Sequence, residues 1–501
     1  MGTSFCHVLT HAGEQYVYDV GTNRLLQIDP VLADVLPLWR GFDADEDVQQ
    51  LGDRHAPSLI HAAMAEIATA RQDEQLFCSE RPQPKPLCDH CFDPASYFSR
   101  LSLLALTVTE QCNLRCHYCL HDTPRNWVRP HRNHNMSLAT ALAALHYFAE
   151  HCRDTTAPII SFYGGEPLLR FDLIQAVVTE IRSHPDWPSF HLTVDTNGTL
   201  LTGEIIEFLV REKIHLQISL DGPLELHDRY RVDKRSRGSH ARVLAGIEQL
   251  LRLDPEAADR LFLVATLTPP FDLPAVMDYF THFPPFASAG IATPPEARIN
   301  FADLEGVDPD RVPQSPEAAA ELRQQLNVLW RRYRDACVTD RRAELPPAMR
   351  SLFDRRLIRI HRRARSPLPV TVSPHGCCQP GLRRLHVKSD GTLQPCERLG
   401  ETMTIGHVKT GIDLASVESL YAGMFQACRE RCANCWAVRL CHLCFTVLAP
   451  TWDPDNPEAC RLPESVCDTV RRELEDDFRR YIQLLAHGAD SVAFLDEITM
   501  S

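Results

Sequence analysis

The chain has 501 residues, which is too long for one ordinary hydrophobic core, so two to four domains are expected. Its formal net charge of −14 argues against a nucleic-acid partner. No apolar run approaches the length of a membrane span, and the segment MGTSFCHVLTHAGEQ lacks the layout of a signal peptide, so we expect a cytoplasmic protein with no membrane partner. The 19 cysteines of such a chain indicate metal or redox chemistry rather than disulfides.

Residues 1–80 are predicted to form a small α+β module. The stretches CHVLTH and EQYVYDV are typical of two strands that turn at Ala12–Gly13, and RLLQID is a candidate third strand. VLADVLPLW and SLIHAAMAEIATARQ have helical spacing. A proline-rich segment within residues 81–100 then separates this module from the rest of the chain and is predicted to be a linker.

Residues 101–310 alternate strand-like and helix-like patterns, which predicts an α/β fold. Five predicted strands are each followed by a helical stretch: LSLLALTVT, APIISFYGGEP, FHLTVDTNG, IHLQISLDG and RLFLVATLTP. A sixth strand is predicted near SAGIATPPEARINF. Repeated β–α units predict a parallel sheet with helices outside it, either a barrel or an open arc. The ligand site is then expected in the loops at the carboxyl ends of the strands.

Three cysteines occupy the first of these loops. Cys112, Cys116 and Cys119 follow the strand LSLLALTVT with the spacing C-x3-C-x2-C. Thiolates suit iron–sulfur clusters, and three of them leave one iron of a four-iron cluster open to a ligand that is not protein. The alternative is a structural zinc site, which normally uses two C-x2-C pairs and would need His117 as its fourth ligand.

The motifs in the next three loops resemble those of the radical S-adenosylmethionine (radical SAM) enzymes. GGEP follows the second strand, TNG the third and SLDGP the fourth. The resemblance implies a partial (β/α)6 TIM-like barrel in which the three cysteines hold a 4Fe–4S cluster. The open iron of that cluster binds S-adenosylmethionine in the family, and reductive cleavage of this cofactor gives a 5′-deoxyadenosyl radical.

The same resemblance implies which residues contact the cofactor. In the family the GGEP segment approaches the amino group of the cofactor, the serine after the fourth strand contacts its ribose, and an aromatic residue flanks it. The residues at these and neighbouring positions are Tyr118, Gly164, Gly165, Glu166, Pro167, Asn197, Ser219 and Arg231.

The charged stretch 311–370 is predicted to be a helical bridging region. Its basic run RRLIRIHRRAR extends from Arg355 to Arg365. Such a run is typical of a solvated helix face, and the alternative is a docking surface for an acidic peptide or another protein.

Cysteines dominate residues 371–501, and their spacing resembles that of the SPASM extension of radical SAM enzymes. That extension holds two auxiliary 4Fe–4S clusters, so three clusters are expected in all. The resemblance assigns four cysteines to the distal cluster, with Cys460 as the alternative for the last: Cys432, Cys435, Cys441 and Cys467. It assigns three to the nearer cluster: Cys378, Cys396 and Cys444.

The chain departs from the SPASM pattern at two places. Only two residues precede Cys444 where three are usual, and Val372 stands where a further ligand of the nearer cluster is expected. Cys377 is a candidate replacement, and an iron left open for substrate is the alternative. Zinc also uses paired C-x2-C spacing and stays an alternative for the whole region.

Glu397, directly after Cys396, is a candidate general base. In SPASM enzymes that mature sulfatases an aspartate at this place has that role. The alternative for Glu397 is an ordinary surface charge.

The segment YVYDVGTNRLLQID resembles the N-terminal segments of SPASM maturases that act on ribosomally made peptides (RiPPs). In those enzymes a winged-helix-like recognition domain (RRE) binds the leader of the precursor peptide by adding a strand to a sheet edge. We therefore expect hydrogen abstraction from a precursor peptide that carries a leader, giving a thioether or carbon–carbon crosslink. A flavodoxin or ferredoxin is the expected electron donor.

Two other functions remain open at this point. One is a sulfatase-maturating enzyme that forms formylglycine. The other belongs to a different class, a non-catalytic iron–sulfur or zinc protein that binds peptides.

Overall fold

The chain is organised in two compact units. The structure, a computed structural model, describes residues 2–40, 50–86, 97, 99–122, 127–313, 315–373 and 378–498. One of the two units, here called the sheet unit, comprises Asp93–Arg355 and Gln379–Leu420. The second, the terminal unit, comprises Met1–Phe92, Arg356–Cys378 and Tyr421–Ser501. The predicted region 371–501 is thus divided between the units, and residues 87–96 of the predicted linker lie outside the described residues.

A ten-stranded sheet forms the centre of the sheet unit. Its six consecutive parallel strands are β5 (Leu103–Thr109), β6 (Ile159–Gly164), β7 (His191–Thr196), β8 (His215–Ser219), β9 (Leu261–Leu267) and β10 (Glu296–Phe301). Neighbours in the sequence are neighbours in the sheet, and β10 ends it at one edge. This order confirms the predicted partial barrel as an open arc.

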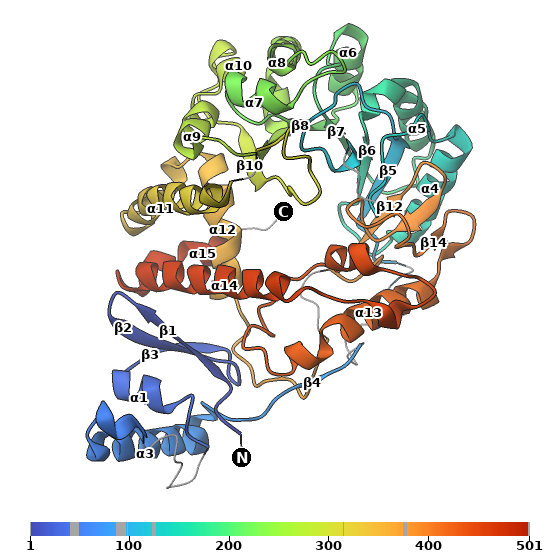
Figure 1. Cartoon of the computed structure of the whole chain (residues 1–501). Helices are drawn as coiled ribbons and strands as arrows, with labels where there is room; N and C mark the ends of the chain where they lie inside the picture. Colours follow the sequence, from blue (N-terminus) through green and yellow to red (C-terminus); the bar gives the residue numbers. More distant parts are fainter. Residues whose placement is uncertain are drawn as a thin grey trace. The chain divides into compact units, whose positions relative to one another are not determined.

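Helices join these strands and lie on the outer side of the arc (Figure 1). They are α4 (Leu138–His151), α5 (Phe171–Ser183), α6 (Gly203–Arg211), α7 (Leu224–Tyr230), α8 (His240–Leu253), α9 (Leu273–Thr281) and α10 (Pro284–Ser288). Helix α4 starts where Ser137 Oγ accepts a hydrogen bond from Thr140 N at 3.1 Å. Along α5, the buried residues Leu173, Ile174, Val177, Val178 and Ile181 recur at three- and four-residue steps, which turns one face to the sheet.

The two faces of the sheet differ in polarity. Along β7 to β10, successive side chains alternate between buried and more exposed positions. Leu263 and Ala265 are buried on the helix side of β9, whereas the half-buried positions of the strands include Asp195, Gln217 and Arg298. The concave face of the arc is therefore polar, while the convex face supplies the hydrophobic core.

Four further strands extend the sheet beyond β5. Strand β12 (Arg384–Val387) pairs in parallel with β5, with Leu385 opposite Leu104. The antiparallel strands β13 (Thr392–Gln394), β14 (Gly406–His407) and β15 (Gly411–Ile412) follow it. The sequence analysis did not anticipate this pairing, because strands of three or four residues give little periodic signal and their partner lies far away in the chain.

The N-terminal part of the terminal unit has its own small core. The strands β1 (Cys6–His11), β2 (Glu14–Asp19) and β3 (Arg24–Ile28) form an antiparallel sheet in that order. They turn at Ala12 and Gly13, whose φ angles are 52° and 88°. Helices α1 (Pro30–Val35) and α3 (Pro57–Glu74) pack on the sheet and share one hydrophobic cluster with it. The strands and helices predicted here are observed, and the likeness to a winged helix stays a prediction.

The remaining helices are α11 (Pro316–Val338), α12 (Pro347–His361), α13 (Leu414–Cys432), α14 (Glu464–Leu485) and α15 (Phe494–Glu497). A short parallel pair, β4 (Gln83–Pro84) with β11 (Thr371–Val372), joins two segments of the terminal unit. No helix among the described residues is both long and apolar enough to cross a membrane.

The N-terminal sheet contacts the C-terminal segment within the terminal unit. The His7 ring stacks on Trp436, with ring centroids 4.0 Å apart and planes 7° from parallel. His7 Nε2 also lies 3.0 Å from Glu475 Oε1. Tyr18, buried on β2, packs against both Trp436 and Phe478. Residues from the two ends of the chain thus share one packed region.

The prediction that the basic run Arg355–Arg365 is a solvated helix face is wrong for Arg356, Arg359 and Arg363. Arg356 Nε donates to Asp477 Oδ1 at 2.6 Å, and Arg359 Nη2 donates to Asp477 Oδ2 at 2.9 Å. Arg363, which is buried, donates to the carbonyl of Asn23 at 2.9 Å. Asp477 itself is fully buried on α14. The run is therefore an internal clamp, because its charges are met by a buried carboxylate and by backbone carbonyls.

This clamp gives a stability prediction. Replacing Asp477 by alanine leaves two partly buried guanidinium groups without their counter-charge, which costs about 3 kcal/mol of unfolding free energy. Urea unfolding followed by circular dichroism measures the loss. The matched control is Asp476→Ala, because that side chain is 50% exposed and lies 3.4 Å from Arg479, and such exposed pairs contribute less than about 1 kcal/mol. Equal unfolding midpoints for the two variants would contradict the clamp.

Candidate metal and cofactor site

The cysteine loop follows β5 and is held in place by the segment after α7. Arg115 N donates to the carbonyl of Val232 at 2.6 Å, and His117 N donates to the carbonyl of Tyr230 at 2.9 Å. Cys119 N donates to the carbonyl of Cys116 at 3.0 Å. These backbone bonds fix the path of the loop independently of any ligand.

The three thiols of this loop lie close to one another. Burial raises the pKa of Cys112 to about 11, that of Cys116 to about 12 and that of Cys119 to about 11. The charge of a neighbouring cysteine adds to each increase, which shows their proximity. Asn197 Nδ2 lies 3.9 Å from Cys112 Sγ, and His131 Nε2 lies 3.7 Å from Cys119 Sγ. Three gathered thiols with polar neighbours fit an iron–sulfur cluster, whose sulfur ligands accept such contacts.

The two glycines of GGEP press against the backbone of the cysteine loop. Gly165 N donates to the carbonyl of Thr109 at 2.9 Å, and Glu166 N donates to the carbonyl of Gln111 at 2.8 Å. A Cβ atom on Gly164 would lie 2.2 Å from Thr109 O, and one on Gly165 would lie 2.1 Å from Gln111 O. Gly164 also has a φ of 141°. The glycines are therefore required by the chain's own packing.

The carboxylate of Glu166 ties the GGEP loop to the TNG loop. It is fully buried, and burial raises its pKa to about 7. Oε1 accepts hydrogen bonds from Thr196 Oγ1 at 2.7 Å and from Leu168 N at 3.1 Å, and Oε2 accepts one from Asn197 N at 2.8 Å. Pro167, also buried, begins the short helical turn that follows. Both carboxylate oxygens thus have partners inside the protein.

Tyr118 belongs to a buried polar group with Asp221 and Arg231. Tyr118 Oη donates to Asp221 Oδ2 and accepts a hydrogen bond from Arg231 Nη1 at 2.6 Å. Arg231 Nη1 lies 3.5 Å from Asp221 Oδ1. All three side chains are buried. Ser219 ends β8 just before this group and is half-buried.

Asp221 was not singled out from the sequence, although it lies in the SLDGP motif. The sequence feature that could have identified Asp221 is its position directly after a buried strand, because a carboxylate there needs hydrogen-bond partners. Thr266 N, on β9, donates to Asp221 Oδ1 at 2.9 Å. Asp221 therefore joins the ends of β8 and β9 and also positions Tyr118.

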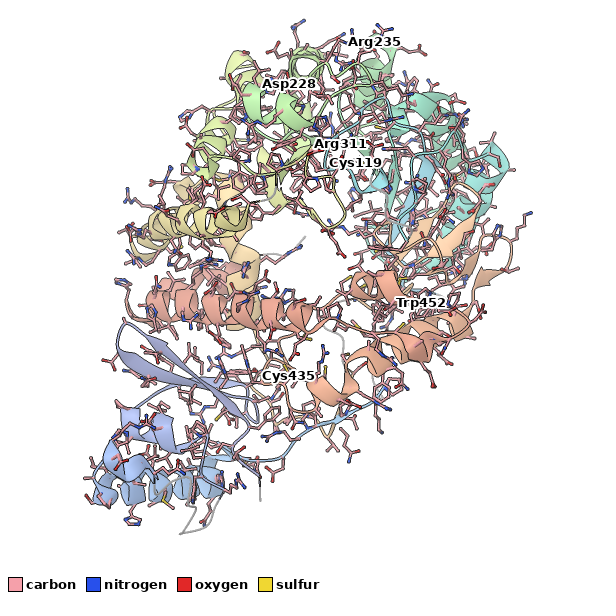
Figure 2. The ribbon with its side chains drawn as sticks, viewed as in Figure 1. Cys119, Asp228, Arg235, Arg311, Cys435 and Trp452 are labelled. Atoms are coloured by element: carbon pink, nitrogen blue, oxygen red, sulfur yellow. The ribbon has the colours of Figure 1, made fainter. Side chains whose placement is uncertain are left out.

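An apolar cover over the cysteine loop was also missed. Tyr118, Tyr230, Val307 and Val312 form a buried cluster, with Cys116 packed against it. Arg311, in the segment after β10, donates through Nη2 to Asp122 Oδ2 at 3.0 Å, and Asp122 lies three residues after Cys119 (Arg311 and Cys119 are labelled in Figure 2). The segment after β10 thus packs against the cysteine loop at Cys116 and Tyr118. Its sequence, ADLEGVDPDRV, has no periodic pattern that would predict this role.

Glu397 contributes to the polar concave face of the sheet unit. Its side chain is 12% exposed and its Oε2 lies 2.6 Å from Arg384 Nη2. Burial raises the pKa of Asp195 to about 6, and the charge of Glu397 contributes to that rise. Burial also raises the pKa of Tyr163, again with a contribution from Glu397. Glu397 therefore lies near Asp195 and Tyr163, and it is not an exposed surface charge.

A second group of thiols lines a pocket in the terminal unit. The four cysteines are Cys432, Cys435, Cys441 and Cys467. Cys432 ends α13 and Cys467 lies in the first turns of α14, so two helices and the loop between them supply the sulfurs. Burial raises the pKa of Cys441 to about 12, with contributions from the other three. Four converging thiols fit a fully ligated iron–sulfur cluster.

Cys460 lies outside this pocket. It is fully buried, and its Sγ packs 3.3 Å from the position that a Cβ on Gly423 would take. Its thiol points to the carbonyl of Thr451 at 3.9 Å. Of the two alternatives for the last ligand, the geometry favours Cys467.

Two arginines line the four-cysteine pocket. Burial raises the pKa of Cys435, and a hydrogen bond from Arg471 counters that rise. Burial also raises the pKa of Cys467, and a hydrogen bond from Arg431 counters it. Cationic donors of this kind stabilise thiolate ligands and the negative charge of a cluster.

The cysteines predicted for the nearer auxiliary cluster are distributed over both units. Cys396 belongs to the sheet unit, whereas Cys378 and Cys444 belong to the terminal unit. Cys378 is exposed. Cys377 lies outside the described residues. Their joint role stays a prediction.

The packing of GGEP gives a second prediction. Gly165→Ala places a methyl group 2.1 Å from Gln111 O, so the GGEP and cysteine loops must separate. We expect loss of the iron bound at Cys112, Cys116 and Cys119, measured as iron and sulfide per chain after anaerobic reconstitution. Gly52→Ala is the control, because nothing lies within 4 Å of a Cβ there. Unchanged iron content in Gly165→Ala would show that the loops do not depend on this contact.

Comparison with known proteins places the cysteine loop in a family. Residues 106–268 match the family model described as the radical SAM superfamily. The chain is 30% identical over 159 residues to a serine-type anaerobic sulfatase-maturating enzyme of Bacteroides thetaiotaomicron, which covers 31% of this chain and 38% of that protein. It is 35% identical over 158 residues to an AdoMet-dependent heme synthase of Methanosarcina barkeri, covering 30% of this chain and 40% of that protein. The chain spans about two-fifths of the length of the curated relatives it matches.

Solved structures share the fold. Polyhistidine-tagged anSMEcpe with bound AdoMet aligns with a TM-score of 0.53 at 19% identity, covering 79% of this chain and 98% of that chain. Native anSMEcpe with bound AdoMet and Kp18Cys peptide also aligns with a TM-score of 0.53, at 16% identity, covering 79% and 99%. Together with the cysteine, GGEP and TNG loops, the family match shows that this chain carries a radical SAM domain over residues 106–268.

Proposed function

We propose that this chain is a radical SAM enzyme with a SPASM region that modifies a ribosomally made precursor peptide. The observation that carries the proposal is the gathering of three thiols in a loop locked by GGEP and TNG within the matched domain. A 4Fe–4S cluster with bound S-adenosylmethionine supplies a 5′-deoxyadenosyl radical when it is reduced. That radical would take one hydrogen atom from the peptide. Closure of the resulting peptide radical to a thioether or carbon–carbon crosslink would then release one electron to an auxiliary cluster and one proton to the proposed base Glu397.

The residues of the domain have distinct roles in this proposal. Cys112, Cys116 and Cys119 hold the cluster. The cofactor lies along the residues proposed above to contact it: Tyr118, Gly164, Gly165, Glu166, Pro167, Asn197, Ser219 and Arg231. Glu166 acts mainly by positioning Asn197 and the glycines, because both of its oxygens already have partners. The apolar cover around Tyr118 excludes water from the cysteine loop, which protects a reactive radical.

The polar concave face is the proposed place for the peptide residue that reacts. Glu397 is proposed as the base that takes a proton there, with Arg384 holding its carboxylate. Asp195 hydrogen-bonds to Ser161 at 2.5 Å and to Gln217, so it orders the same face.

The auxiliary clusters are proposed to accept the electron that product formation releases. A second role proposed for them is to bind the substrate. Cys432, Cys435, Cys441 and Cys467 hold the distal cluster in this proposal, supported by the pocket they line. Cys378, Cys396 and Cys444, with Cys377 as a candidate, hold the nearer one. A flavodoxin or ferredoxin supplies the first electron.

The N-terminal module is the proposed site for the leader of the precursor. Its three-stranded sheet has β1 and β3 at its edges, where an extended peptide can add a strand. Deleting residues 1–80 is a poor test, because it removes His7 and Tyr18, which pack against Trp436 and Phe478 in the rest of the terminal unit. Comparing one peptide with and without its leader tests the module in the intact enzyme.

Sulfatase maturation is the second candidate function. It is favoured by the sequence likeness to sulfatase-maturating enzymes and by a shared fold with a structure that holds a Kp18Cys peptide. The extra N-terminal module is the feature that sets this chain apart from a plain sulfatase maturase.

The activity test begins with cofactor cleavage. The reconstituted, reduced enzyme is expected to form 5′-deoxyadenosine anaerobically, and Cys116→Ala is expected to form none. A wild-type enzyme that never cleaves the cofactor would overturn the proposal and leave a non-catalytic peptide-binding protein. Cys337→Ala is the control, because this buried thiol on α11 is far in sequence from both cysteine groups.

Mass spectrometry of candidate peptides separates the two enzyme functions. A short precursor encoded beside the gene is expected to lose two hydrogen atoms and keep its sulfur, with less product when its leader is removed. Conversion of a cysteine to formylglycine, with loss of sulfur, would instead support sulfatase maturation. Equal modification with and without the leader would contradict leader binding by the module.

The last ligand of the distal cluster gives a further prediction. Cys467→Ala is expected to lower the iron content after reconstitution and to change the EPR signal of the reduced protein. Cys460→Ala is expected to leave both unchanged, because Cys460 lies outside the four-cysteine pocket. The opposite pattern would assign the ligand to Cys460.

A further inference from the structure

Three metal-ligating side chains gather on the outer helical layer of the sheet unit. His146 lies on α4, Glu180 lies in the last turn of α5, and His184 caps the same helix. Each offers one ligand atom, and these atoms all lie within 4.8 Å of one another. Helices α4 and α5 run back from the cysteine and GGEP loops, so their C-terminal turns lie toward the opposite end of the strands. The cluster is therefore separate from the proposed radical site.

The Glu180 carboxylate lies between the two imidazoles. Its Oε1 is 3.2 Å from His146 Nε2 and 3.7 Å from His184 Nδ1. His184 Nδ1 also lies 3.0 Å from the carbonyl of Glu180, one helical turn earlier. Ser183 Oγ lies 3.0 Å from the same nitrogen. In the ion-free protein Nδ1 donates its proton to the carbonyl, so an ion at Nδ1 requires the other tautomer, with the proton on Nε2, and release of this hydrogen bond.

Trp187 orients both imidazoles. Its ring stacks on His184, with centroids 4.1 Å apart and planes 13° from parallel. It meets His146 edge to face, with centroids 4.9 Å apart. The two rings are thus held by packing before any ion arrives, which lowers the ordering cost of binding.

The donor set matches a defined class of ion. Two imidazoles and one carboxylate are the protein ligands of many zinc sites, with a fourth position left to water. Ligand atoms in such a site are about 3.3 Å apart, as expected from metal–nitrogen distances near 2.0–2.1 Å. Small side-chain adjustments bring the three atoms to that spacing. The His146 side chain is 46% exposed, so an ion can enter from solvent.

We propose that His146, Glu180 and His184 form a site for a divalent transition-metal ion of the zinc class. The ion links α4 to α5 and leaves one coordination position to water. Without an ion, the same side chains form a hydrogen-bonded cluster. The site is independent of the iron–sulfur chemistry and does not rest on the proposed function.

Zinc titration of the full-length, cluster-loaded protein tests the site. By anaerobic calorimetry, wild type is expected to bind one more zinc ion per chain than His146→Ala. The cysteines are the same in both proteins, so their zinc binding cancels in the comparison. The control is His282→Ala. His282 lies 3.2 Å from Asp278 in an exposed pair of the sheet unit, and among the described residues this pair has no third metal-ligating side chain. Equal zinc stoichiometry in wild type and His146→Ala would overturn the proposal.

Hydrogen exchange of the wild-type protein locates the ion, and this measurement does not depend on the folding of a variant. Zinc is expected to slow amide exchange in the C-terminal turns of α4 and α5 in wild type. Glu180→Gln keeps the shape of the side chain but removes its charge, and it should weaken zinc binding by about tenfold or more. Protection elsewhere, with none in these two turns, would place the ion at another site and overturn the assignment.

Discussion

One buried carboxylate connects the ends of three parallel strands. Glu166 follows β6, its oxygens accept hydrogen bonds from Thr196 and Asn197 after β7, and its own N–H donates to Gln111 after β5. A buried carboxylate is costly unless it is hydrogen-bonded, so the three loops must meet at this point in the folded protein. The glycines before Glu166 make the meeting possible, because any side chain there would collide with the cysteine loop. The meeting of the cysteine, GGEP and TNG loops is thus a consequence of strand order in the sheet.

Negative charge is controlled locally in a chain that is acidic overall. Arg231 is buried with Tyr118 and Asp221 beside the first cysteine group, and Arg431 and Arg471 line the second. Cations next to sulfur favour the thiolate form and oppose the build-up of negative charge on reduction. The two proposed cluster sites lie in different units of the chain, and in both of them arginine side chains lie beside the cysteines.

Local pattern was enough to predict the strands β5 to β10. β5 and β6 are short, mostly apolar runs and β7 to β10 alternate, and both patterns lie within one short segment of the chain. Local pattern also identified the loops that meet at Glu166, since parallel strands put their carboxyl ends at one edge. The pairing of β12 with β5 depends on residues 279 or more positions apart, as in the contact of Thr107 with His386, and no local pattern carries such information. The same limit explains the wrong prediction for the basic run. Its spacing is that of a solvated helix face, and the partner of its arginines, Asp477, lies too far along the chain to be recognised from the local sequence. Cys467 could be preferred over Cys460 by resemblance, but only the fold places it with the other three thiols.

The stacking of His7 on Trp436 has a consequence for biosynthesis. Trp436 is the residue after Cys435, so strand β1 packs against the segment that supplies one thiol of the four-cysteine pocket. The chain is made from the N-terminus, and the hairpin of β1 and β2 therefore leaves the ribosome long before the helix α14 that completes its surroundings. Contacts between distant parts of a sequence form slowly and only after the intervening chain has been synthesised. The contacts of Tyr18 with Phe478 and of His7 with Glu475 can therefore form only after the ribosome has made α14, although the strands that carry Tyr18 and His7 were made first.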